Sequence, residues 1–134
     1  AHSPAQDDTH ALQGRLIAIL PKHTGYVFDA AFAPDCQSVA TSENNFGKQF
    51  RFWNATTGAH LFTVQSQRGA AGAIDITPDG LRVAYGVEIW DIARRRLLHV
   101  LPITAEVYTV SFTPDGRSLA VGDHTGRIGL WDVN

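Results

Sequence analysis

A pattern of short motifs recurs three times along the chain, at the ~40-residue spacing typical of stacked sheet repeats. The dipeptide Pro-Asp occurs at residues 34–35, 78–79 and 114–115. Each unit also carries a tryptophan followed by an asparagine or aspartate: Trp53-Asn54, Trp90-Asp91 and Trp131-Asp132. Because both markers recur three times in the same order, we interpret the chain as three copies of one supersecondary unit.

Each unit holds short segments rich in β-branched and aromatic residues, the pattern of strands. We expect first strands at 27–32, 73–76 and 107–112, second strands at 38–41, 82–85 and 118–121, and third strands at 49–53, 87–90 and 127–131. Outer strands are expected at 61–64 and 97–101, with a further one at 16–20 before the first unit. No stretch has a sustained helical period with caps. The sequence thus predicts an all-β chain of four-stranded antiparallel sheets.

The Pro-Asp pair explains how the first two strands of each unit are joined. Proline presets the first turn position, aspartate tolerates the second, and glycine adopts positive φ at the third. Gly80 and Gly116 occupy the third position in two units, whereas Cys36 occupies it in the first. A side chain at positive φ costs about 1 kcal/mol, so we expect replacement of Cys36 by glycine to be neutral or stabilising.

Composition excludes several classes of protein. The chain has 134 residues, of which 44% are hydrophobic, and a formal net charge of -2, so nothing indicates binding of nucleic acid or anionic membranes through bulk charge. No apolar run is long enough to span a bilayer, and a single cysteine excludes an internal disulfide. Catalytic motifs such as a nucleophile elbow or phosphate loop are lacking. We therefore predict no catalytic residue, metal site or cofactor.

The tryptophan motifs and turns resemble those of the WD-repeat family of β-propellers. The segments that carry the resemblance are TPDG at 77–80 and 113–116, together with VEIWDI and RIGLWDV, which look like the family's third strand. The resemblance covers about residues 14–134, with units at about 14–58, 59–95 and 96–134. It implies a β-propeller segment of about three four-stranded blades. The polar residues 1–13 lie outside it and are expected to form a flexible tail.

In this family a histidine, a strand hydroxyl, the tryptophan and a turn aspartate often form a buried hydrogen-bonded set, which this chain matches only in part. His23 has the place of the histidine in the first unit, but the other units have no counterpart. Asp123 lies two places out of register in the third unit. The residues expected to be structural are Trp53, Trp90, Trp131, Asp91, Asp132 and His23. We therefore expect the blades to be held mainly by apolar packing.

Three blades are fewer than the ~4–8 of a closed propeller. The sequence starts with a spare outer strand and stops after a third strand, so a single chain would be incomplete, with two apolar faces and a strand edge exposed. Four arrangements are open: two chains giving six blades, three chains giving nine, a piece of a longer polypeptide, or a partial propeller docked on a larger assembly. In the first, residues 15–20 pair beside residues 127–132 of a second copy.

The predicted interface residues fall into three groups. The first group would complete a ring: Arg15, Leu16, Ile17, Ile19, Leu20, Arg127, Ile128 and Leu130. The second is the loop Asn44, Asn45 and Phe46, where an aromatic stands among amides, as in many contact surfaces. The third is the run Arg94, Arg95 and Arg96, whose guanidiniums suit an anionic partner. A solvated loop is the alternative for the arginines, and packing of Phe46 onto its own sheet is the alternative for the second group.

The resemblance implies a non-enzymatic protein–protein interaction scaffold or accessory subunit, which completes its propeller by self-association or docks on a larger complex. The alternative is a ligand-binding or enzymatic propeller of several chains with a site in the central channel. The inner strands offer four polar residues to such a channel: Asp29, Asp75, Thr109 and Ser111. Localisation is open, because a start at Ala1 fits both a cleaved secretory signal and a fragment boundary.

Overall fold

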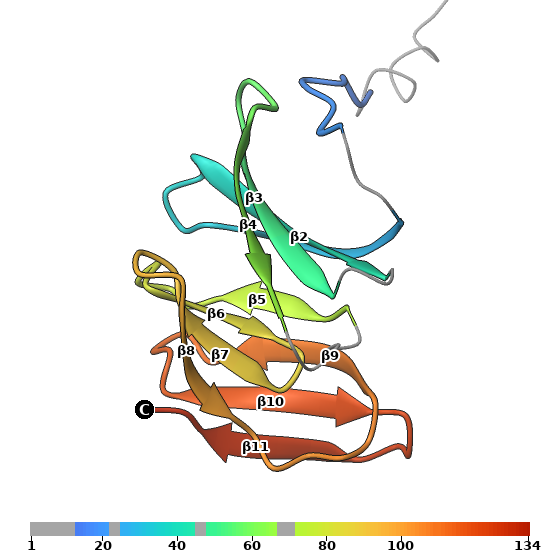
Figure 1. Cartoon of the computed structure of the whole chain (residues 1–134), viewed down its shortest axis with the longest axis vertical. Coiled ribbons are helices and arrows are strands. Elements are labelled where there is room, and N and C mark those ends of the chain that lie inside the picture. Colours follow the sequence, from blue (N-terminus) through green and yellow to red (C-terminus); the bar gives the residue numbers. More distant parts are fainter. Residues whose placement is uncertain (1–12, 22–24, 45–47, 67–71) are drawn as a thin grey trace, which may run out of the picture.

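The computed structural model describes residues 13–21, 25–44, 48–66 and 72–134, and these ranges contain strands but no helix. Three antiparallel sheets of four, four and three strands follow one another along the chain (Figure 1). The first sheet comprises β1 (Tyr26–Phe32), β2 (Ser38–Asn44), β3 (Gln49–Asn54) and β4 (His60–Gln65). The second comprises β5 (Ile74–Ile76), β6 (Arg82–Tyr85), β7 (Glu88–Asp91) and β8 (Arg96–Val100). The third comprises β9 (Val107–Phe112), β10 (Ser118–Asp123) and β11 (Ile128–Asp132), and the predicted all-β fold class is confirmed.

The first strands of the three sheets lie next to one another. Strand β1 contacts β5, and β5 contacts β9, whereas β4 and β8 lie at the far edges of their sheets. Within each sheet every strand pairs with its neighbour in sequence, which is the simplest antiparallel topology. This arrangement is that of propeller blades, with the first strands innermost.

The expected outer strand at residues 16–20 is not a strand. Residues 13–21 form no strand in the structure, and the third sheet ends at β11. A single extended segment gains no ladder hydrogen bonds until another strand pairs with it, so it does not persist as a strand alone. Leu16, Ile17 and Ile19 are accordingly exposed.

The turns between the first two strands of each sheet have the predicted geometry. Cys36 has a φ of 63°, close to the 76° of Gly80 and the 75° of Gly116. In each turn this residue donates its backbone N–H to the carbonyl three residues earlier. Cys36 therefore occupies a conformation that favours glycine.

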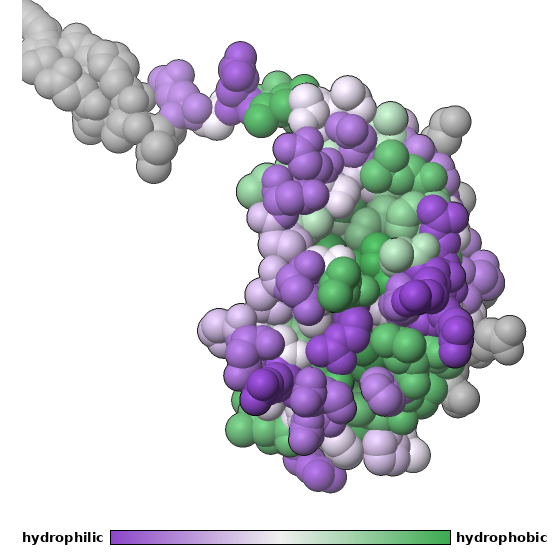
Figure 2. All heavy atoms as spheres, turned by 90° about the vertical axis from the view of Figure 1, so that its left-hand side faces the viewer, coloured by the Kyte–Doolittle hydropathy of each residue, from purple (hydrophilic) through white to green (hydrophobic). Residues whose placement is uncertain are grey.

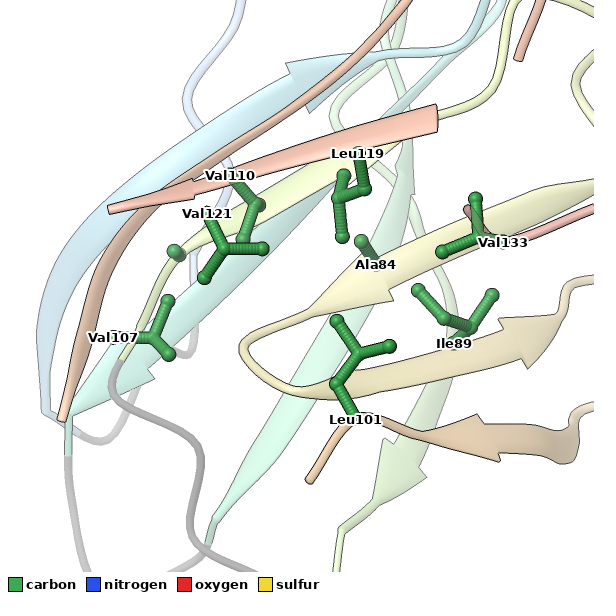
Figure 3. Packing of buried hydrophobic residues seen from close by; sticks show 9 residues of the cluster. Ala84, Ile89, Leu101, Val107, Val110, Leu119, Val121 and Val133 are labelled. Atoms are coloured by element: carbon green, nitrogen blue, oxygen red, sulfur yellow. The ribbon is translucent and has the colours of Figure 1, made fainter. Parts of the chain in front are cut away.

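Two apolar cores hold the sheets together. The core between the first and second sheets is formed by buried residues of both: Ala40, Phe50, Phe52, Val64, Ile74, Ile76, Val83 and Tyr85. In the core between the second and third sheets, Ala84, Ile89 and Leu101 face Leu119, Val121 and Val133 (Figure 3). Both cores are made almost wholly of aliphatic and aromatic side chains, so the hydrophobic effect drives the stacking.

Two carboxylates connect neighbouring inner strands. The Oδ2 atom of Asp29 on β1 accepts the backbone N–H of Ile74 on β5 at 3.1 Å. The Oδ2 atom of Asp75 on β5 accepts the backbone N–H of Phe112 on β9 at 2.8 Å. Each bond satisfies an N–H that the first strand of a sheet cannot pair within its own ladder.

The strain at Cys36 gives a direct prediction. Replacement of Cys36 by glycine should leave the free energy of unfolding unchanged or raise it by up to about 1 kcal/mol, because glycine adopts positive φ without a steric penalty. Thermal denaturation followed by circular dichroism measures this. The matched control is Gly116→Cys, which places the same side chain in the equivalent turn and should lower the melting temperature. A lower melting temperature for Cys36→Gly would contradict the prediction.

Candidate interaction surfaces

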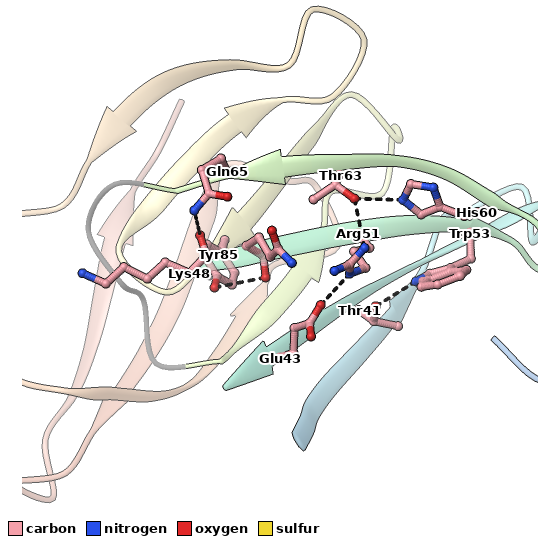
Figure 4. Close-up of polar contacts among 10 residues, drawn as sticks. Thr41, Glu43, Lys48, Arg51, Trp53, His60, Thr63, Gln65 and Tyr85 are labelled. Atoms are coloured by element: carbon pink, nitrogen blue, oxygen red, sulfur yellow. Dashed lines mark hydrogen bonds and ion pairs between the residues drawn. The ribbon is translucent and has the colours of Figure 1, made fainter. Parts of the chain in front are cut away.

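The tryptophan of the first sheet lies on the face turned away from the second sheet. Trp53 and Thr41 follow Phe52 and Ala40 in sequence, and successive residues of a strand project to opposite faces. Trp53 is fully buried, and its Nε1–H donates to the Thr41 hydroxyl at 2.9 Å (Figure 4). This pairing supplies the strand hydroxyl that the resemblance implies, whereas His23 lies outside the described residues.

The other two tryptophans have different surroundings. Trp90 donates its Nε1–H to the Glu88 carboxylate at 3.0 Å, and Ser66 donates its hydroxyl to the same oxygen at 2.8 Å. In the first sheet, Thr41 lies two residues after the strand partner of Trp53. In the third sheet, Val121 lies two residues after the strand partner of Trp131, so a valine takes the place of Thr41. No hydrogen bond to the Trp131 indole is found in the described part of the chain. In the second sheet the Glu88 carboxylate therefore accepts the indole N–H in place of a hydroxyl. In the third sheet, as far as it is described, the indole hydrogen bond is lost.

Buried acidic groups lie around the first core. Glu43 is buried and accepts a hydrogen bond from Nε of Arg51 at 2.5 Å (Figure 4). Burial raises the pKa of the Tyr85 phenol to about 12, and the nearby charges of Glu88 and Glu43 act in the same direction. Tyr85 therefore remains a neutral hydrogen-bonding group across the physiological pH range.

The outward face of the third sheet is apolar and uncovered. In each sheet, the residue before the tryptophan lies on the face against which a following sheet can pack. Phe52 and Ile89 are buried there, at 3% and 0% exposed, whereas Leu130 is 79% exposed. Ile128, two residues earlier on the same face of β11, is 74% exposed. The chain's own repeats thus show that this position is buried wherever another sheet follows. In the described part of the chain, β11 pairs only with β10, so its other side is an open edge of the third sheet.

The structure does not bring the two predicted ring-closing segments together within one chain. Residues 13–21 pass the turn between β3 and β4, where the Ile19 carbonyl lies against Gly58. Arg15 and Leu16 are exposed and Leu20 is half-buried, in a segment that lies beside the first sheet, whereas Arg127 precedes β11 in the third. Their pairing between two copies stays a prediction.

The arginine run is partly engaged within the chain. Arg94 donates from its backbone N–H to Asp91 Oδ1 at 2.8 Å, and this bond is the main cause of a lowered pKa of the Asp91 carboxyl. The Arg95 guanidinium lies over the ring of Phe62 at 3.9 Å from its centroid, and Arg96 begins β8 in an exposed position. The three guanidiniums therefore do not form one free basic patch. Asp132 also forms a local hydrogen bond, since its Oδ1 accepts the Asn134 N–H at 3.0 Å.

The predicted contact loop at residues 44–46 falls mostly outside the described part of the chain. Asn45 and Phe46 lie outside the described residues, and only the backbone pairing of Asn44 with Tyr26 is described. Among the residues that the structure does describe, no three His, Cys, Asp or Glu side chains are grouped to hold a metal ion. Over the same ranges no helix is long and apolar enough to cross a membrane.

A cleft that the sequence did not indicate lies between the first and second sheets, at the end where their first turns meet. It has a volume of about 280 Å³, and Asp35 and Asp79 line it together with Phe52, Phe62 and Ile92. Figure 2 views this end of the sheets, where hydrophobic residues are visible between hydrophilic ones. The cleft joins turns from two different repeats, so no local sequence pattern marks it.

The sequence profile of WD40 repeats, described as WD domain, G-beta repeat, matches residues 14–54 and 95–132, more than half of the chain. The chain belongs to the WD40 family. Its relatives include the Periodic tryptophan protein 2 homolog of Schizosaccharomyces pombe, 30% identical over 100 residues, or 70% of this chain and 12% of that protein. Eukaryotic translation initiation factor 3 subunit I of Pyricularia oryzae is 33% identical over 91 residues, 60% of this chain and 27% of that protein.

A third relative, Autophagy-related protein 16 of Arabidopsis thaliana, is 26% identical over 128 residues, 90% of this chain and 24% of that protein. The chain therefore spans only about an eighth to a quarter of the length of these relatives. The profile confirms the resemblance inferred from the tryptophan and turn motifs.

The raised pKa of Tyr85 predicts a specific loss of stability at high pH. The folded-state pKa of about 12 exceeds the ordinary tyrosine pKa of 10.0, so the stabilisation is complete below pH 10 and is lost as pH rises toward 12. The free energy of unfolding, measured by denaturant titration, should fall more steeply over this interval for the wild type than for Tyr85→Phe. Tyr26→Phe, at an exposed tyrosine, should retain the wild-type slope. Equal slopes for all three proteins would contradict the assignment.

Proposed function

We propose that this WD40 segment is a non-enzymatic protein–protein interaction scaffold that binds a further sheet of its own kind. The observation that carries the proposal is the exposure of Leu130, at the position where Phe52 and Ile89 are buried by a following sheet. Ile128 is exposed as well, whereas its counterpart in the first sheet, Phe50, is buried. Large apolar side chains side by side on a sheet face favour association, because their burial removes apolar area from water. The relative named as subunit I of a translation initiation factor supports a role within an assembly.

The sheet that binds is supplied by a second copy of this chain. The first sheet exposes Val27 and Phe32 on the face of β1 turned away from the second sheet, so the chain carries apolar surface at both ends of its stack. One copy's third sheet then packs on the next copy's first sheet, in the same order as the sheets inside the chain. Such a head-to-tail contact is heterologous and closes into a ring if the rotation permits.

The edge of β11 adds a second element to this interface. An unpaired edge strand offers backbone N–H and C=O groups to any extended segment. The exposed apolar residues Leu16, Ile17 and Ile19 of a second copy are suited to pair there, since they form no strand in their own chain. Backbone pairing fixes the register, while the sheet face supplies most of the buried apolar area.

The structure does not favour the alternative of a site in a central channel. Asp29 and Asp75, the acidic residues on the inner strands, each accept a backbone N–H of the neighbouring sheet. Their carboxylates thus connect sheets, and we assign them a structural role.

The proposed docking face is tested by charge introduction. The double variant Ile128→Lys/Leu130→Lys should sediment as a monomer, whereas the wild-type chain should form a larger species, because two buried lysines would cost far more than the contact provides. Analytical ultracentrifugation across a dilution series measures both. The matched control is Leu81→Lys, at an exposed leucine of the β5–β6 turn, which should associate like the wild type. Identical assembly of the wild type and the double variant, or a monomeric wild type, would overturn the proposal.

A further inference from the structure

An arginine of the chain itself fills the junction between the turns of the second and third sheets. Arg82 begins β6, and its Nη2 donates to the Gly116 carbonyl at 2.9 Å. Its Nη1 donates to the Val133 carbonyl. The guanidinium thus spans two backbone acceptors of the next sheet with its fixed fork of donors.

The junction between the first and second sheets has serine in place of this arginine. Ser38 pairs with Asn54, the residue after the first tryptophan, as Arg82 pairs with Asp91, the residue after the second. Ser38 is therefore the structural equivalent of Arg82, with a side chain too short to reach the following sheet.

The acceptors that Arg82 uses have equivalents at the first junction. Gly80 ends a Pro-Asp-Gly turn as Gly116 does, and Ile92 follows Trp-Asp as Val133 does. Ser38, Gly80 and Ile92 all line the cleft of about 280 Å³ between the first two sheets. The cavity therefore lies where a guanidinium lies at the second junction.

Two carboxylates give this cleft a negative wall. Asp35 Oδ1 accepts the Gln37 N–H at 2.9 Å, and Asp79 Oδ1 accepts the Leu81 N–H at 3.0 Å. These bonds hold both side chains in place, and in the described ranges neither Oδ2 atom is engaged. A hydrogen bond from the Thr77 hydroxyl is the main cause of a lowered pKa of Asp79, which keeps that group ionised at neutral pH.

Aromatic and aliphatic side chains give the same cleft an apolar wall. Phe52, Leu61, Phe62 and Ile92 line it. The ring of Phe62 already receives the guanidinium of Arg95 at 3.9 Å from its centroid, so an aromatic surface of this cleft accepts a planar cation. Arg95 over Phe62 and Arg82, whose charge acts on Asp79, offset part of the negative charge of the two aspartates.

We propose that this cleft binds an arginine side chain of a partner protein, in the position that Arg82 occupies at the next junction. The aliphatic stem packs on Phe52 and Ile92, and the guanidinium bonds to the Gly80 and Ile92 carbonyls and to the free oxygens of Asp35 and Asp79. Lysine fits less well, because a single ammonium cannot span two backbone carbonyls as the guanidinium fork does. The cleft lies at the turn end of the first two sheets and is independent of the face around Leu130.

The probe is an end-capped pentapeptide with arginine between glycines, compared with the same peptide carrying citrulline, which is uncharged and of similar shape. NMR titration of the full chain should show the arginine peptide perturbing the amides of residues 33–38 and 79–81. The citrulline peptide should bind at least about tenfold more weakly, because it lacks charge-assisted hydrogen bonds. Equal binding of the two peptides, or perturbations elsewhere only, would overturn the proposal.

The matched variants place an arginine side chain of this chain itself in the cleft. Ser38→Arg should raise the melting temperature and abolish peptide binding, since the new guanidinium takes the proposed position. Ser118→Arg is the control, because it adds the same charge at the equivalent site of the third sheet and should leave binding unchanged. The pair Asp35→Asn/Asp79→Asn keeps each Oδ1 acceptor and should weaken binding about tenfold. Retained binding in Ser38→Arg, or in the double asparagine variant should Ser38→Arg not fold, would refute the proposed site.

Discussion

The packing of one sheet's third strand against the next sheet is the contact on which this structure depends. Phe50 and Phe52 of β3 are buried by the second sheet, and Ile89 of β7 is buried by the third. Short strands in separate sheets have no backbone ladder between them, so the apolar contact must supply most of the free energy of stacking. Leu130, at the equivalent position of β11, is 79% exposed. We therefore propose that the interaction surface repeats this folding interaction once more, between chains.

Polar groups refine this stack and do not replace its apolar contacts. Asp29 and Asp75 each bind one backbone N–H of the following sheet, and Arg82 bridges two carbonyls. Around the tryptophans the units have diverged: Thr41 accepts from Trp53, and Glu88 accepts from Trp90. Loss of such a bond is tolerated because a single hydrogen bond contributes only about 1 kcal/mol net, whereas a buried sheet face contributes several.

The sequence predicted those features that local chemistry determines. Strand positions follow from alternating residues, and the positive φ of Cys36 follows from its place after Pro-Asp. The strand at 16–20 was wrong as a description of the single chain, because a strand exists only with a partner and the pattern does not reveal whether one is present. The bond from Trp90 to Glu88 and the cleft at Ser38 were missed, because both depend on which groups from different segments come together. Asn45, Phe46 and His23 lie outside the described residues.

Hydrogen exchange along β11 is the most direct measurement of whether another sheet docks on the third. Backbone amides at an unpaired strand edge exchange rapidly, and pairing with a further strand protects them. Mass spectrometry of the peptide covering Ile128–Asp132 should show slow exchange at high chain concentration and fast exchange on dilution, while β6 and β10 remain protected throughout. Fast exchange of this peptide at every concentration, with the inner strands protected, would contradict the account.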